Sequence, residues 1–255
     1  MITDKAGRRF FLGSLLAGAC AGQQPRYAPK QSDRPEAPAG GGDEAGFEEI
    51  FDGKTLKGWE GDPVYWRVED GAMVGEITPA TVIKSNTFII WRGGEPADFE
   101  LKVDFRITSG GNSGINYRSV VVPDKPTPAN KFALRGYQCD IDGQNRYTGI
   151  NYEERGRLFL AVRGQVTRVT GTSKPAVLAR LGDEKALASL ISSDWNSVHI
   201  IARQHIVMHH LNGQLMTMVI DDDSAGRAAK GLIGVQVHVG GPMKVEYRRW
   251  RLKQG

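Results

Sequence analysis

In the stretch Phe99-Glu100-Leu101-Lys102-Val103-Asp104-Phe105-Arg106-Ile107, apolar and charged residues alternate over nine positions. Successive side chains of a β-strand point to opposite faces, so this stretch predicts a strand with one apolar and one charged face. Such a strand is typical of an antiparallel sheet that has one side on a core and the other in water.

Turn signals elsewhere in the chain support the same interpretation. Asp70-Gly71 and Asn212-Gly213 each lie between apolar runs, and both are strong two-residue hairpin signals. The second pair is predicted to join Ile206–Leu211 to Leu215–Ile220. Only Asp183–Ile191 has the spacing of a helix. Many strands and one short helix predict an all-β, two-sheet antiparallel sandwich of the jelly-roll kind.

The composition is that of an ordinary globular protein of 255 residues, with 40% hydrophobic and 24% charged residues. The net charge of +4 is mild, and no basic stripe is apparent, so no nucleic acid partner is expected. The two cysteines, Cys20 and Cys139, do not look like a disulfide pair. Cys139 lies between core residues of a predicted strand and is expected to be a buried free thiol.

The N-terminus carries a targeting signal. Arg8-Arg9 precedes the apolar run Leu12–Ala19 and then Cys20, which is the order of a twin-arginine signal peptide over residues 1–20. The stretch ending at Cys20 resembles a lipoprotein cleavage box, so Cys20 is expected to be lipidated and to anchor the chain to a membrane. The alternative is ordinary cleavage near Ala19 and a soluble product. The chain is expected to meet the twin-arginine export machinery and to be a periplasmic or cell-envelope protein.

Residues 21–46 are expected to form a disordered tether. The segment contains several prolines, the run Gly40-Gly41-Gly42 and almost no large apolar residue. It cannot bury enough surface to offset its chain entropy. The folded domain is accordingly predicted to span residues 47–255.

Polar residues are predicted to share one face of a later strand. Residues 137–142 alternate, with apolar side chains at the odd positions and Gln138, Asp140 and Asp142 at the even ones, each about 7 Å from the next. Aspartate disfavours strands, and two aspartates on one face raise each other's pKa, so a compensating group is expected nearby. The alternative is an ordinary solvated face. The natural companions, which alternate with apolar residues in their own strands, are Arg118, Gln236 and His238.

Several motifs occur in order from about Phe47 to Lys253. They are Phe51-Asp52-Gly53-Lys54-Thr55-Leu56-Lys57-Gly58-Trp59, Asn112-Ser113-Gly114-Ile115 with Arg118, Gly136-Tyr137-Gln138-Cys139-Asp140-Ile141, Asp194-Trp195-Asn196, and Gly234-Val235-Gln236-Val237-His238. The ordered set resembles the 3-keto-disaccharide hydrolase family. The resemblance implies the concanavalin A-like sandwich of lectins and glucanases, and a carbohydrate substrate.

One departure from the family pattern bears on mechanism. Many members carry Glu-x-Gln on the central strand, where this chain has Gln138-x-Asp140. Related sandwich glucanases use two glutamates that flank an aspartate, and at those spacings this chain has Gln138, Asp140 and Asp142. An amide is neither a nucleophile nor a useful base, so the two-carboxylate route of retaining glycosidases is disfavoured. A route that needs one base fits better.

The family implies a hydrolase whose substrate has a ketone at carbon 3, which acidifies the hydrogen on carbon 2. One base can remove that hydrogen, the group on carbon 1 leaves by elimination, and added water gives net hydrolysis. Asp140 is predicted to be the base or a metal ligand, Arg118 or a divalent cation to stabilise the enolate, and His238 to be the acid or a ligand. The other residues predicted to contact the sugar are Gln138, Asn112, Asp142, Gln236 and Glu154.

A divalent metal is compatible with these side chains, but no compact ligand spacing demands one. The run Asp140-Ile141-Asp142-Gly143 superficially resembles a calcium loop, yet the twelfth position is Asn151 rather than glutamate, so that site is rejected. His205, His209 and His210 lie on a predicted strand. They are expected to be partly buried or surface residues rather than ligands.

Two rival functions stay open on the sequence alone. The same sandwich serves lectins, so the alternative is a non-catalytic carbohydrate-binding module tethered in the cell envelope. A second alternative is an envelope scaffold whose polar groove is vestigial. Turnover of an oxidised sugar would indicate the enzyme, whereas saturable binding of unmodified glycan without turnover would indicate the lectin.

Overall fold

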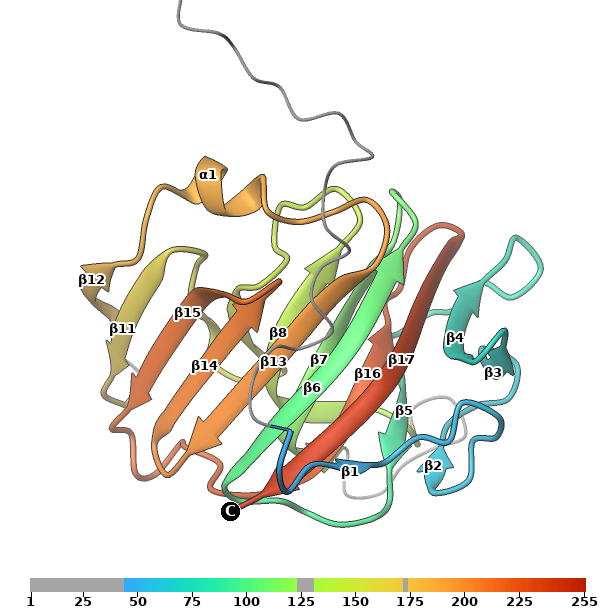
Figure 1. Cartoon of the computed structure of the whole chain (residues 1–255), viewed down its shortest axis with the longest axis horizontal. Coiled ribbons are helices and arrows are strands. Elements are labelled where there is room, and N and C mark those ends of the chain that lie inside the picture. The colour runs from blue at the N-terminus through green and yellow to red at the C-terminus, as the bar shows by residue number, and fades with distance from the viewer. Residues whose placement is uncertain (1–43, 123–130, 172–173) are drawn as a thin grey trace, which may run out of the picture. The chain divides into compact units, whose positions relative to one another are not determined.

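The computed structural model describes residues 44–122, 131–171 and 174–255, which consist almost wholly of strands (Figure 1). The predicted signal peptide, Cys20 and nearly all of the predicted tether lie outside the described residues. Within the described ranges, no helix is long and apolar enough to cross a membrane. The strands form two sheets, which confirms the predicted all-β sandwich.

The larger sheet has ten strands within the described residues, antiparallel except for the pair β11–β15. Its strand β6 is the alternating stretch Phe99–Ile107, with the bounds that the sequence predicts. The order is β12 (Ala176–Arg180), β11 (Gln165–Val169), β15 (Gln214–Asp221), β14 (Ile206–Leu211), β13 (Asn196–Arg203), β6, β17 (Met243–Gln254), β4 (Ala72–Ile77) and β3 (Trp66–Glu69), with β1 (Glu48–Glu49) beside β17.

The smaller sheet is antiparallel throughout and has seven strands among the described residues. It carries the strand on which the sequence places the polar residues, β8, near its middle. The order is β10 (Leu158–Ala161), β9 (Asn151–Glu154), β8 (Leu134–Asp142), β7 (Asn112–Val121), β16 (Leu232–Val237), β5 (Thr87–Trp91) and β2 (Trp59–Glu60).

The hydrophobic core lies between the facing sides of the two sheets. Tyr117, Tyr137 and Cys139 contribute to it from the smaller sheet, and Leu101 and Tyr247 from the larger one. All five are fully buried, and removal of this surface from water is the main force that holds the sheets together. Cys139 is a buried free cysteine, as predicted, and burial raises the pKa of its thiol.

Both predicted hairpins are present. Asp70-Gly71 joins β3 to β4, and Asn212-Gly213 joins β14 to β15. Both residues of each pair have positive φ, which a two-residue turn of this hand requires. The helix α1 (Glu184–Ala188) is shorter than predicted. Asp183 caps its first turn, and the chain leaves the helix after Ala188.

The charged face of β6 is less exposed than predicted, because ion pairs cover it. Lys102 Nζ lies 3.0 Å from a carboxylate oxygen of Glu44, near the start of the described chain. Arg249 Nε on β17 donates to Asp104 Oδ2 at 2.6 Å. Lys102 and Asp104 are consequently buried.

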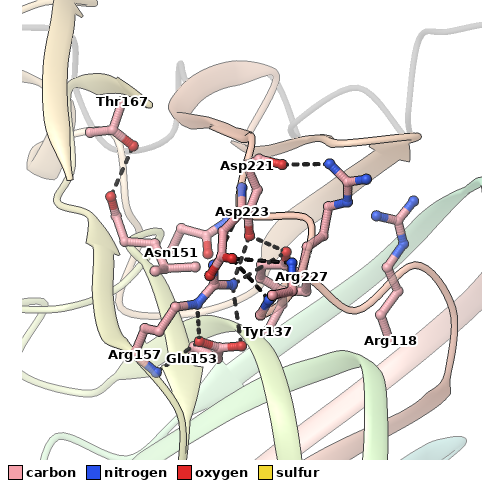
Figure 2. A network of polar contacts seen from close by, with 12 residues as sticks. Arg118, Tyr137, Asn151, Glu153, Arg157, Thr167, Asp221, Asp223 and Arg227 are labelled. Carbon is pink, nitrogen blue, oxygen red and sulfur yellow. Dashed lines mark hydrogen bonds and ion pairs between the residues drawn. The ribbon is translucent and has the colours of Figure 1, made fainter. Parts of the chain in front are cut away.

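A buried ion cluster joins the two sheets at one end of the sandwich (Figure 2). Arg157 donates to Glu153 of β9 at 2.6 Å and to Asp221 at the end of β15 at 2.7 Å, and it lies 3.3 Å from Asp223. Tyr137 of β8 donates to Asp221 as well. Asp221 is 1% exposed, so its charge depends on Arg157 for compensation.

We expect Arg157→Leu to lower the free energy of unfolding by about 3–5 kcal/mol, because it leaves the Glu153 and Asp221 carboxylates buried without a cation. Urea unfolding followed by circular dichroism measures the loss. Arg67→Leu is the control, because Arg67 pairs with Glu69 and Glu76 at the surface and should cost less than about 1 kcal/mol. Equal losses in the two variants would contradict the structural role of the cluster.

Candidate functional site

The outer face of the smaller sheet carries a row of polar residues on adjacent strands. Asn116 of β7 lies opposite Gln138 of β8 on one side and opposite Gly234 of β16 on the other. Tyr152 of β9 continues the row beyond Gln138. Directly opposed residues share a face, so these side chains lie on the side of the sheet away from the core.

A second row of residues lies on the same face, two positions further along each strand. Asp140 lies opposite Gly114, and continuation of the β16–β7 register puts Gln236 on the other side of that glycine. A Cβ at Gly114 would lie 2.5 Å from Cδ of Gln138. The glycine therefore lets the Gln138 side chain lie across β7, between the two rows, where it meets Asp140.

The two rows together form the floor of the candidate site, and the amide side chains of this floor are buried without hydrogen-bond partners. Both polar atoms of Asn116 and of Gln236 lack a hydrogen bond, and so does Oε1 of Gln138. All three residues are at most 2% exposed. Buried polar atoms are nearly always paired in proteins, because an unpaired one costs about 1–3 kcal/mol. Several of them on one face therefore indicate a surface built to bind a polar ligand.

Asp140 is the charged group among these amides. Gln138 donates Nε2–H to Oδ1 of Asp140 at 2.8 Å, and Asp140 is 8% exposed. Burial raises the pKa of Asp140 to about 7, Asp142 and Glu154 add to the rise by charge repulsion, and the Gln138 hydrogen bond opposes it. A carboxyl with such a pKa can accept or give up a proton near neutral pH.

A side-chain contact lies over this floor. Asn86, just before β5, donates to Glu154 of β9 at 3.3 Å, and its Oδ1 accepts a bond from the backbone N–H of Val239 at 2.9 Å. Since β16, β7 and β8 separate β5 from β9 in the sheet, and the core fills the inner side, the contact forms above the outer face.

An apolar cluster borders the polar floor on the side of β5. Phe88 and Ile90 of β5 lie opposite Gln236 and Gly234, respectively. They pack with Phe132, which lies just before β8, and with Leu134, the first residue of β8. The face is therefore divided into an apolar part over β5 and a polar part over β7 and β8.

The predicted residues His238, Asn112 and Asp142 lie at the neighbouring ends of β16, β7 and β8, and they have different roles. His238 follows β16, and its Nδ1–H donates to the carbonyl of Val239 at 2.6 Å, while Nε2 has no hydrogen bond to the residues that the structure describes. Asn112 accepts the His238 N–H through its carbonyl at 3.2 Å. Asp142 lies opposite Asn112, but its two oxygens accept backbone N–H groups of the following turn, at residues 144, 146 and 147. Asp142 thus holds that turn rather than facing a ligand.

The structure does not bring Arg118 to this face, contrary to the sequence-based expectation. Its guanidinium group donates to the carbonyls of Ala97 at 2.8 Å and Gln204 at 2.7 Å, and lies 3.2 Å from Asp98. The reason is a bulge in β7 after Tyr117, where Arg118 has φ of 45° and the register shifts. A bulge re-aims the side chain, so simple alternation fails at this position.

The histidines of β14 behave as structural residues. His209 is fully buried between the Tyr117 hydroxyl at 2.8 Å and the carbonyl of Ile150 at 3.1 Å. Burial lowers the pKa of His209 to about 3, so it stays neutral. This burial exceeds the partial burial expected from the sequence. Within the described ranges, no three His, Cys, Asp or Glu side chains are grouped closely enough to hold a metal ion.

Sequence reasoning missed Asn116, Tyr152 and Asn86. Asn116 lies two residues before Arg118, so the alternation that selected Arg118 also contained Asn116. No comparable signal marks Tyr152 or Asn86, because their positions depend on the pairing of β9 with β8 and on the path of the chain before β5. Burial raises the pKa of Tyr152, with Glu154 and Asp140 adding to the rise, so its phenol stays protonated beside them.

Two cavities lie away from Asp140. The larger, of about 470 Å³, includes Asp142, Thr148, Asn196 and Glu246 in its wall. The smaller, of about 420 Å³, is lined by arginines near the ion cluster of Figure 2.

The chain matches known proteins in sequence over most of its length. The family model described as the 3-keto-alpha-glucoside-1,2-lyase-like domain matches residues 46–253. A 3-keto-disaccharide hydrolase of Bacteroides thetaiotaomicron is 25% identical over 197 residues, which cover 68% of this chain and 58% of the relative. The match thus spans less than two thirds of that curated relative.

Solved structures agree on the fold. A candidate glycosyl hydrolase of Parabacteroides distasonis is 21% identical with a TM-score of 0.52, over 82% of this chain and 94% of that one. A Bacillus subtilis protein with a galectin-like fold is 15% identical with a TM-score of 0.54, over 78% and 90% of the two chains. These likenesses are to a sandwich of the lectin type.

We expect Asp140→Asn to stabilise the chain at pH 8 by about 2–4 kcal/mol and to leave its stability at pH 4 nearly unchanged. The folded state raises the pKa of Asp140 from 3.8 to about 7, so it binds this proton more tightly than the unfolded state does. The wild type therefore loses stability as the pH rises from about 4 to about 7, and the variant does not. Urea unfolding at several pH values measures the difference. A gain independent of pH, or none, would contradict the raised pKa.

Proposed function

The chain belongs to the 3-keto-alpha-glucoside-1,2-lyase-like domain family, and we propose that it cleaves the glycosidic bond of sugars that carry a ketone at carbon 3. At the level of the family, it is a carbohydrate-active domain related to glycosyl hydrolases. The observation that carries the finer proposal is Asp140, a buried carboxyl with a pKa of about 7 beside three amides with unpaired polar atoms.

The chemistry needs one base of moderate strength. Asp140 removes the proton on carbon 2, and the electron pair of that C–H bond forms a C2=C3 double bond while the ketone oxygen becomes an enolate. The enolate then re-forms the ketone, a C1=C2 double bond forms, and the bond from carbon 1 to the glycosidic oxygen breaks. The leaving oxygen takes a proton. Addition of water across the new double bond completes net hydrolysis.

In this proposal the unpaired amides, rather than Arg118, stabilise the enolate. Nδ2 of Asn116 and Nε2 of Gln236 are donors without acceptors, and donors aimed at an enolate oxygen stabilise it in a site from which water is excluded. Oε1 of Gln138 is an acceptor without a donor, which suits a sugar hydroxyl. The floor thus offers both kinds of partner that a keto-sugar requires.

Two groups can protonate the leaving oxygen. His238 has its Nε2 free at the edge of the face, and its imidazolium form carries a proton there. Tyr152 carries a phenol proton near Asp140 and Glu154, and burial keeps its pKa above the ordinary value. Asn112 and Glu154 remain contacts for hydroxyls of the sugar in this proposal.

The second candidate function is a lectin-like module, which the likeness to a galectin-like fold supports. A lectin needs hydrogen-bonding side chains but has no use for a buried carboxyl that titrates near neutrality. The raised pKa of Asp140 therefore favours the enzyme.

We expect the full chain to turn over a 3-keto-glucoside or 3-keto-trehalose, and Asp140→Asn to lower kcat by about 100-fold or more, because the amide cannot accept the C2 proton. Asp70→Asn is the control, since Asp70 lies in a hairpin turn where asparagine is equally suitable. Chromatography of the released sugar measures the rate.

Full turnover by Asp140→Asn would exclude Asp140 as the base. Saturable binding of an unmodified disaccharide, without turnover of any keto-sugar by the wild type, would identify the lectin instead.

We also propose that the chain is exported and held at a membrane through a lipid on Cys20, on the evidence of Arg8-Arg9 and the apolar run that follows. Cys20→Ala should abolish labelling by radioactive palmitate and move the protein from the membrane fraction to the soluble one. Lysine at both Arg8 and Arg9 should block export. Unchanged labelling and fractionation in Cys20→Ala would exclude the lipid anchor.

A further inference from the structure

The cavity of about 420 Å³ near the ion cluster is lined mainly by cations. Its side chains include five arginines and one carboxylate, which are Arg118, Arg135, Arg155, Arg157, Arg227 and Glu153. They come from β7, β8, β9, the turn between β9 and β10, and the chain between β15 and β16. Figure 2 shows part of this wall, with Arg118 and Arg227 beside the ion cluster.

The charges of this wall do not balance. Glu153 is fully engaged by Arg157, which binds it through Nε at 2.6 Å and through its backbone N–H at 2.7 Å. Arg157 is also paired with Asp221 and Asp223. Neither Arg135 nor Arg227 has a carboxylate oxygen within 4.0 Å among the residues that the structure describes. Among the described residues, at least two positive charges in the wall therefore lack a counter-ion.

Two of the guanidinium groups lie close to one another. Arg227 uses one donor, Nη1, on the carbonyl of Asp221 at 2.7 Å, and its group lies toward that of Arg118 (Figure 2). Arg118 is 1% exposed, and Asp98, at 3.2 Å, is the one carboxylate that pairs with it in the described part of the chain. Burial lowers the pKa of Arg118, and the charge of Arg227 lowers it further. An anion bound by Arg227 would offset this repulsion.

The cavity has room for such an anion. The segment that carries Arg227 contributes Ala225, Gly226 and Ala228 to the wall, and the short side chains of these residues take up little of the space in the cavity. A volume of about 420 Å³ is within the range of small-molecule sites. Guanidinium groups bind phosphate and sulfate through paired, charge-assisted hydrogen bonds.

We propose that this cavity binds a tetrahedral oxyanion of the phosphate or sulfate class, either as the free ion or as an ester carried by a sugar. Two uncompensated arginines match a doubly charged anion better than a singly charged carboxylate. Arginines on separate segments also match an anion whose oxygens point in several directions, whereas a carboxylate offers two oxygens in one plane. The site is distinct from the Asp140 face and does not depend on the reaction proposed there.

The test is calorimetric titration of the full chain with sodium sulfate, sodium phosphate and glucose 6-phosphate at constant ionic strength. We expect saturable one-to-one binding of the oxyanions, weakened at least tenfold in Arg227→Gln and in Arg135→Gln. Arg67→Gln, a surface arginine paired with Glu69 and Glu76, should bind like the wild type. Both test residues lack carboxylate partners among the described residues, and Arg227→Gln removes one hydrogen bond to the carbonyl of Asp221. Thermal unfolding without ligand should therefore be almost unchanged in Arg135→Gln and only slightly earlier in Arg227→Gln.

Tighter binding of glucose 6-phosphate than of inorganic phosphate would identify the sugar ester as the ligand, and equal binding would identify the free oxyanion. Either result supports the proposal. No saturable binding of any of the three, or binding that Arg227→Gln and Arg135→Gln leave unchanged, would overturn it.

Discussion

The arrangement of this molecule depends on β8, a strand whose two faces are both buried. Its odd-numbered residues, such as Tyr137 and Cys139, join the core between the sheets. Its even-numbered residues Gln138 and Asp140 lie on the outer face, where water would normally solvate them, yet they are at most 8% exposed. The contact between Asn86 and Glu154 lies above that face. Burial of a carboxyl without a cation is unfavourable, and it is tolerated where the chemistry of a site needs it.

The same burial determines the basicity of Asp140. A carboxyl in water would be ionised at pH 7 and would be a weak base. Removal from water makes Asp140 a stronger base, and the unpaired amides of Asn116 and Gln236 stand ready to bind the oxygen on which negative charge would develop. A single base therefore suffices, which agrees with the presence of an amide at position 138 where a second carboxylate would be needed for ordinary retaining hydrolysis.

Alternation predicted the strands β6 and β8 and the faces of Gln138 and Asp140, because a period of two is strictly kept where strands are regular. It failed at Arg118, where the bulge in β7 turns the side chain away from the face. It also could not reveal that Asp142 is used by its own turn, or that Asn86 bonds Glu154. Contacts of that kind depend on long-range pairing and loop paths, which local patterns do not encode.

The bulge that removes Arg118 from one face places it in the wall of the arginine-lined cavity, so one irregularity in β7 separates the two sites.

The central claim, that the glycosidic bond breaks after a proton leaves carbon 2, can be tested on a 3-keto-glucoside labelled with deuterium at carbon 2. Cleavage in ordinary water should give a product that has lost the label, because Asp140 removes it before the glycosidic bond breaks. A hydrolysed product that keeps its deuterium would contradict the account.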